Sequence, residues 1–141
     1  MTKTYHKDKT LPIDGEIFVF GSNTAGIHGA GAAFVAQRQF GARAGKGIGY
    51  STKGGCKHSY AIPTKGNRLE VLSIDDIRKY VDDFKMFLTY NPNVKCFVSR
   101  VGCGLAGYMD HEIAPLFAGC GDNVIFSEEW APFVAGSEFS L

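Results

Sequence analysis

Three side chains in this sequence are of types that exchange protons or attack an electrophile: His28, Lys65 and Asp110. Imidazoles titrate near neutral pH and can also donate to a phosphate, while lysine and aspartate can act as nucleophile or base. Each residue also has a structural interpretation, because His28 can fix a turn, Lys65 can be solvated and Asp110 can cap a helix ending at residue 117. We therefore treat the three as catalytic candidates with both interpretations open.

Two glycine-rich segments, 21–31 and 101–108, each follow an apolar run. Glycine lets backbone N–H groups approach a ligand without interference from a Cβ atom, as phosphate-cradling loops require. In α/β sheets, ligands bind at the carboxyl ends of adjacent strands. The two segments therefore predict a phosphate-bearing ligand held between them. The candidate ligand-binding residues are Gly21, Ser22, Asn23, Gly29, Ala30, Gly31, Gly102, Cys103, Gly104, Leu105, Ala106, Gly107 and Tyr108.

Two of these residues have alternative roles. The amide of Asn23 can bind a ribose hydroxyl or stabilise the turn that follows its strand. Cys103 can contact a ligand or pack beneath its loop, and packing is favoured because no base is adjacent in sequence. The run 41–49 has the look of a triphosphate-binding loop, but three residues separate Gly41 from Gly45 where that motif needs four. Residues 41–55 are therefore expected to form an irregular surface loop.

Alternating apolar patterns predict the elements that position these residues. The predicted strands are 16–20, 59–63, 96–99 and 123–126, and the predicted helices are 30–40, 73–90 and 110–117. The 73–90 helix is the clearest, because Ser73 and Asp76 resemble a capping box and apolar residues repeat at helical spacing. Alternating strands and helices indicate an α/β fold with a mostly parallel or mixed central sheet.

Length and composition agree with a small globular protein. The 141 residues predict an N-terminal extension (1–14), one domain (15–133) and a loose tail (134–141). The net charge of +1 argues against non-specific nucleic-acid binding, and no apolar run is long enough to span a bilayer. The four cysteines and four histidines lack metal-binding spacing, so we assign no metal, no cofactor and a cytoplasmic location. Trp130 is interpreted as a packing residue.

With these residues assembled, the sequence resembles the macrodomain superfamily, whose members bind ADP-ribose, over residues 16–130. Segments 20–23 (FGSN) and 29–33 (GAGAA) are similar to the family's first ligand loop, where an Asn approaches the distal ribose and glycines admit the diphosphate. Segment 100–105 (RVGCGL) is similar to the second loop of one branch, the terminal ADP-ribose glycohydrolases and yeast-type ADP-ribose 1″-phosphate phosphatases. Compact macro-like proteins of bacteria and phages also resemble this chain.

The resemblance implies a three-layer α/β/α macrodomain-like fold and roles for particular residues. In the glycohydrolases a lysine after the second strand attacks the ribose carbon, and an aspartate directly after the GCGL motif assists. Lys65 matches that lysine, whereas Ala106 occupies the position of the aspartate. The aspartate that contacts adenine has its candidate counterparts in Asp14 and Glu16.

Two functional hypotheses follow. The first is a hydrolase of ADP-ribose 1″-phosphate or of an ester-linked ADP-ribosyl group, in which the three catalytic candidates supply acid, base or nucleophile. The second is a non-catalytic module that binds or sequesters ADP-ribose or a related NAD-derived nucleotide, which Ala106 favours. A cysteine hydrolase that uses Cys103 and His28 ranks below both. The expected partners are an ADP-ribose derivative and ADP-ribosylated protein.

Overall fold

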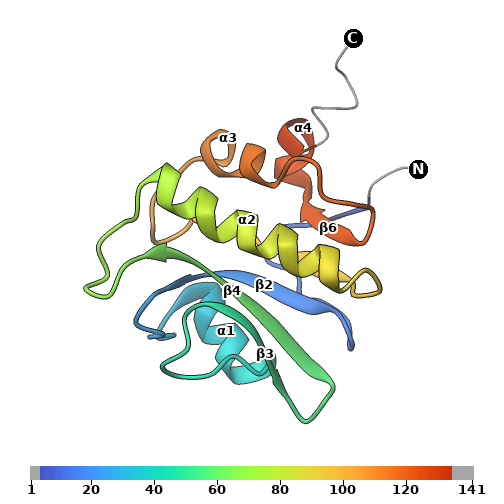
Figure 1. Cartoon of the computed structure of the whole chain (residues 1–141), viewed down its shortest axis with the longest axis horizontal. Helices are drawn as coiled ribbons and strands as arrows, with labels where there is room; N and C mark the ends of the chain where they lie inside the picture. Colours follow the sequence, from blue (N-terminus) through green and yellow to red (C-terminus); the bar gives the residue numbers. More distant parts are fainter. Residues whose placement is uncertain (1–3, 135–141) are drawn as a thin grey trace.

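The computed structural model describes residues 4–134, which build a six-stranded sheet with helices on both faces (Figure 1). The strands are β1 (Tyr5–His6), β2 (Ile17–Asn23), β3 (Gly49–Lys53), β4 (Lys57–Lys65), β5 (Cys96–Val98) and β6 (Val124–Ser127). Their order is β1-β6-β5-β2-β4-β3, and every neighbouring pair is parallel except β3 and β4. This arrangement confirms the predicted α/β class with a mostly parallel, mixed sheet.

Helices cover the sheet from opposite sides, with α1 on one face and α2 on the other (Figure 1). The helices are α1 (Gly31–Gln39), α2 (Ile74–Tyr90), α3 (Asp110–Ile113) and α4 (Ala131–Val134), with 3₁₀ helices at Ala114–Phe117 and Glu128–Trp130. Side chains alternate along β2, so that Ile17 and Val19 enter the core on the α2 side while Phe18 and Phe20 enter the core on the α1 side. All four are buried, which explains the continuous apolar run that marks a central parallel strand.

The predicted 73–90 helix is confirmed as α2. Ser73 is its N-cap and accepts a hydrogen bond from the backbone N–H of Asp76 over 3.2 Å. Ile77, Val81 and Phe84 lie at helical spacing and are fully buried against the sheet. The helix ends at Tyr90, two residues before Pro92.

Two segments expected to be irregular contain strands instead. Tyr5 and His6, in the predicted N-terminal extension, pair in parallel with β6 at the sheet edge. The predicted loop 41–55 contains β3, which forms a hairpin with β4 through Gly54 and Gly55, at φ +68° and +75°. Left-handed glycines at two of the three loop residues, 54–56, suit the twist of a tight hairpin. The pairing with β3 also explains why β4 begins at Lys57, before the predicted 59–63, while pairing with β2 extends it to Lys65.

The region from residue 110 to the C-terminus also differs in detail. Asp110 is the first helical residue of α3 rather than its cap, because Met109 takes the cap position and its N–H donates to Glu112 over 2.9 Å. A 3₁₀ helix replaces α-helix from Ala114 onward, as Pro115 predicts. Val134, assigned to the loose tail, is buried in α4. The rest of that predicted tail, 135–141, lies outside the described residues.

Neither a membrane span nor a metal cluster is found in residues 4–134. No helix there is long and apolar enough to cross a bilayer. No group of three or more His, Cys, Asp or Glu side chains in that range is placed to hold a metal ion. The cysteines are all free thiols.

Candidate functional site

A pocket of about 760 Å³ opens at the carboxyl ends of β2, β4 and β5, between the two glycine-rich segments. Its volume is within the range of small-molecule sites. Because the three strands are parallel, they deliver their last residues to the same edge of the sheet. The pocket contains most of the predicted ligand-binding residues: Gly21, Asn23, Gly29, Ala30, Gly31, Gly102, Cys103, Gly104, Leu105 and Ala106. Ser22, Gly107 and Tyr108 lie outside its lining.

The glycines of the pocket fall into two groups. Gly31 and Gly102 have φ of +60° and +77°, a backbone conformation that favours glycine. Gly29 and Gly104 have ordinary φ, and a Cβ atom added to either would find no heavy atom within 4 Å in the described chain. The fold therefore does not explain why positions 29 and 104 lack side chains. Both are exposed and line the pocket.

The N-terminus of α1 borders the same pocket through Gly31, Ala32 and Ala33. Its cap residue, Ala30, supplies no side-chain hydrogen bond in the described structure. The first N–H groups of a helix lack partners within the helix and favour an anion. This helix end therefore offers backbone donors next to the open glycine positions.

Lys65 is brought to the pocket, as predicted. It is the last residue of β4, and its backbone carbonyl accepts a hydrogen bond from Thr24 N–H over 3.0 Å. Its side chain lines the pocket and makes no hydrogen bond or ion pair to any residue in the range 4–134. The ammonium group is thus available to a ligand.

His28 lies outside the pocket, contrary to the role of acid or base expected for it. Its Nε2 faces the carbonyl oxygens of Arg43 and Lys46 at 3.0 and 3.1 Å, and its ring packs edge-on against Phe20. The residue is only 5% exposed. Two carbonyl neighbours place the proton on Nε2, so the imidazole joins the first glycine loop to the 43–47 segment. This geometry matches the turn-fixing interpretation.

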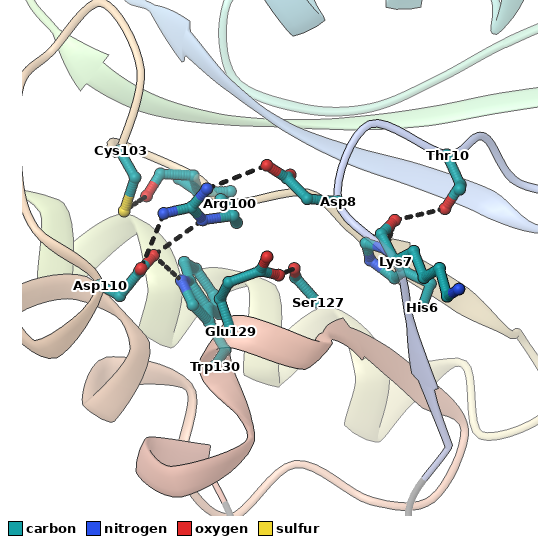
Figure 2. A network of polar contacts seen from close by, with 11 residues as sticks. His6, Lys7, Asp8, Thr10, Arg100, Cys103, Asp110, Ser127, Glu129 and Trp130 are labelled. Carbon is teal, nitrogen blue, oxygen red and sulfur yellow. Dashed lines mark hydrogen bonds and ion pairs between the residues drawn. The ribbon is translucent and has the colours of Figure 1, made fainter.

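Asp110 also lies outside the pocket lining, and its carboxylate is already bound. Oδ1 accepts from Arg100 Nε at 2.9 Å and from the Trp130 indole at 2.8 Å, while Oδ2 accepts from Arg100 Nη2 at 2.7 Å (Figure 2). Hydrogen bonding by Arg100, and less by Trp130, lowers the pKa of Asp110. A carboxylate held in this way is a weak base, which argues against the proposed role in proton transfer.

Asn23 and Cys103 both make structural contacts from within the lining. Both amide atoms of Asn23 bond the backbone of Ile27, with Oδ1 accepting at 2.9 Å and Nδ2 donating at 2.7 Å. Burial, followed by the nearby Asp110 carboxylate, raises the pKa of the Cys103 thiol to about 12. A thiol that stays protonated is a poor nucleophile, which weighs against the cysteine-hydrolase hypothesis.

Several residues of the pocket have no signal in the sequence that predicts their place there. The N-terminal segment contributes His6, Asp8, Lys9, Thr10 and Leu11, because β1 lies beside β6 and the chain then runs along the pocket. A two-residue strand has no periodic signal, so no pattern in the sequence could have revealed this segment.

Aromatic residues form one apolar wall of the pocket. Phe18 and Phe97 line it, and the His6 ring stacks on Phe97 with ring centres 3.8 Å apart and an interplanar angle of 15°. Within residues 4–134, two non-glycine residues have left-handed backbones, Lys9 and Leu69, and both line the pocket. Such strain is concentrated at functional sites, which favours a functional role for this pocket.

Comparisons with known proteins place the fold but not the function. No family model and no curated protein matches the sequence. A solved structure described as a protein of unknown function from Bacteroides thetaiotaomicron has a TM-score of 0.62 and 15% identity, over 90% of this chain and 98% of that chain. A structural-genomics crystal structure from the same organism has a TM-score of 0.57 and 14% identity, over 89% and 99% of the two chains. At these identities the similarity concerns the fold alone.

Proposed function

We propose that this protein is macrodomain-like and binds ADP-ribose, or a closely related NAD-derived nucleotide, in the pocket between its two glycine-rich loops. The observation that carries the proposal is the pair of open glycines, Gly29 and Gly104, whose absent side chains serve no need of the fold. A ligand group that approaches the backbone of both loops closely, as a diphosphate does, would account for glycine at these two positions.

Other features of the pocket support a nucleotide. The N-terminus of α1 offers N–H donors for phosphate oxygens. The wall made by Phe18, Phe97 and His6 offers flat apolar surface against which a base or sugar can pack. Lys65 adds a positive charge at the same edge of the sheet. The pocket thus offers suitable groups for the phosphate, the sugar and the base of a nucleotide.

Hydrolysis of an ADP-ribose derivative is the second candidate function, and Lys65 is the observation that favours it. Of the three predicted catalytic residues, Lys65 lines the pocket, whereas His28 and Asp110 are engaged in structural contacts outside its lining. A hydrolase built on this site would depend on Lys65 and on the backbone donors of the loops. Ala106, which also lines the pocket, supplies no acid or base there.

Calorimetric titration with ADP-ribose tests the proposal, with AMP as the comparison ligand. Gly29→Ala should weaken binding of ADP-ribose by at least about tenfold without lowering stability, because position 29 lines the pocket and a Cβ added there meets no protein atom. Gly121→Ala is the control for a Cβ added away from the pocket, and its stability is measured alongside because that Cβ would lie 3.0 Å from Oδ1 of Asn123. It lies just before β6, at the amino edge of the sheet, opposite the pocket.

Two results would contradict the proposal: no binding of ADP-ribose by the wild-type protein, or equal affinity in the two glycine variants. Release of phosphate from ADP-ribose 1″-phosphate, or of ADP-ribose from modified protein, would separate the two candidate functions. With Lys65→Ala an enzyme should lose that release by a much larger factor than it loses affinity. Binding without release would identify a binding module.

A further inference from the structure

The guanidinium of Arg100 lies between two carboxylates that come from distant parts of the chain (Figure 2). Asp110 binds one edge in two hydrogen bonds, with Nε to Oδ1 at 2.9 Å and Nη2 to Oδ2 at 2.7 Å. Asp8 binds the remaining terminal nitrogen, with Nη1 to Oδ2 at 2.9 Å. The two aspartates differ in how firmly the rest of the protein holds them, and they bind different edges of the Arg100 guanidinium.

Asp110 is the fixed partner. Besides Arg100 it binds the indole N–H of Trp130, which is fully buried, and it belongs to the first turn of α3. A bidentate pair with a third donor has a defined geometry. Asp110 and Trp130 lie outside the lining of the pocket, so they hold Arg100 in place without occupying the pocket.

Asp8 is the replaceable partner. It lies in the segment that follows β1, and within residues 4–134 its carboxylate makes no hydrogen bond or ion pair besides those with Arg100. Arg100 and Asp8 both line the pocket, and their side chains are 30% and 31% exposed. An ion pair this accessible contributes little to stability, so Asp8 can leave Arg100 when a better anion is present.

Arg100 also has donors to spare. Guanidinium carries five N–H groups, of which Nε–H, one on Nη1 and one on Nη2 are used in the described structure. With Asp8 displaced, three donors on Nη1 and Nη2 would face outward. A tetrahedral phosphate can accept two of them at once, as Arg-phosphate pairs commonly do.

We propose that Arg100 is the phosphate-recognising residue of the pocket and that Asp8 is an internal counter-ion, which a phosphate of the ligand displaces. This inference rests on the proposed function and deepens it, because it assigns an ionic contact to a ligand otherwise held by backbone groups. It makes Asp110 and Trp130 positioning residues. It also couples ligand binding to the N-terminal segment, since Lys9, Thr10 and Leu11 follow Asp8 along the same pocket.

The experiment compares the wild-type protein with Asp8→Asn, Arg100→Gln and the control Asp75→Asn, which removes the exposed Arg78–Asp75 ion pair on α2. Each protein is titrated with ADP-ribose, inorganic pyrophosphate and adenosine at low ionic strength. Asp8→Asn removes the competing charge, so it should bind ADP-ribose and pyrophosphate about two- to fivefold more tightly. Adenosine affinity should not change, and Asp75→Asn should match the wild type with every ligand.

Arg100→Gln should lose at least about tenfold in affinity for pyrophosphate and ADP-ribose while its affinity for adenosine is kept. The sign of the Asp8→Asn effect is decisive, because an ion pair with a purely structural role would leave affinity unchanged or reduced when it is broken. Thermal denaturation of each variant checks that it is folded at the temperature of the titrations.

Failure of the inference and failure of the proposed function give different results. Wild-type binding of ADP-ribose without any gain in Asp8→Asn would overturn the role of Asp8 and Arg100 and leave the proposed function intact. Arg100-dependent binding of pyrophosphate that tightens in Asp8→Asn, without binding of ADP-ribose, would overturn the proposed function and support the anion site. Binding of neither ligand by any of the proteins would overturn both.

Discussion

The indole N–H of Trp130 donates a hydrogen bond to Oδ1 of Asp110 over 2.8 Å, so the tryptophan at the end of the 128–130 3₁₀ helix holds the carboxylate that fixes Arg100. Trp130 is fully buried and packs against Phe117 and Phe126. This one contact links the hydrophobic core to the wall of the pocket. It also explains why Asp110 is a structural acid rather than a catalytic one.

Trp130→Phe should destabilise the protein by about 1.5–3 kcal/mol, because it removes a hydrogen bond to a charged group while an aromatic ring remains in the core. Urea denaturation followed by circular dichroism measures the change in the free energy of unfolding. A loss below about 0.5 kcal/mol, within the range of ordinary surface substitutions, would show that the Asp110 carboxylate does not need this donor.

Stability should fall in acid through Asp110. Its pKa in the folded protein is lowered below the ordinary value of 3.8, chiefly by hydrogen bonding to Arg100. A lowered pKa contributes stability that is present above the unfolded-state value and is lost as the pH falls through the folded-state value. The urea midpoint of the wild type should therefore decline below about pH 4 more steeply than that of Asp110→Asn. Parallel curves for the two proteins would contradict the assignment.

Local patterns explain which parts of the fold were predictable. The apolar spacing and the Ser73 cap define α2 without reference to the rest of the chain. The glycine-rich segments 21–31 and 101–108 each follow a buried strand, so the parallel sheet brings them to one edge and creates the predicted pocket.

The parts that could not be predicted depend on contacts between distant residues. Asp8 and Arg100 are separated by 92 positions, and the pairing of β1 with β6 that brings them together involves two residues on each strand. His28 is buried because segment 43–47 folds over it, which no pattern around residue 28 reveals. Lys65 and Asp110 were both catalytic candidates in the sequence, and the contacts of Asp110 with Arg100 and Trp130 separate their roles.

Cys103 should react slowly with alkylating reagents at neutral pH. Burial raises the pKa of its thiol to about 12, which keeps the nucleophilic thiolate scarce. Cys56 is exposed and provides an internal comparison in the same molecule. Mass spectrometry after brief iodoacetamide treatment should find Cys56 modified well before Cys103. Preferential modification of Cys103 would restore the cysteine-hydrolase hypothesis.

Substitution of His28 should lower the stability of the protein, whereas substitution of Lys65 should leave it nearly unchanged. His28→Ala leaves the carbonyls of Arg43 and Lys46 without their donor, so the free energy of unfolding should fall by about 1–3 kcal/mol. Lys65→Ala should change stability by less than about 0.5 kcal/mol, because the side chain makes no polar contact within the described structure. Thermal denaturation and ligand titration of both variants measure these effects. A stable His28→Ala protein with impaired chemistry would return His28 to the list of catalytic residues.

The most direct test of nucleotide binding in this pocket is a titration of ¹⁵N-labelled protein with ADP-ribose, in which the amide chemical shifts are recorded. We expect the N–H signals of Gly29, Gly31 and Gly104 to shift at saturation, together with those at the start of α1, because these groups border the proposed diphosphate site. Signals of the β3–β4 hairpin at Gly54 and Gly55 should remain in place. The absence of shifts, or shifts confined to residues outside the pocket, would contradict the central claim.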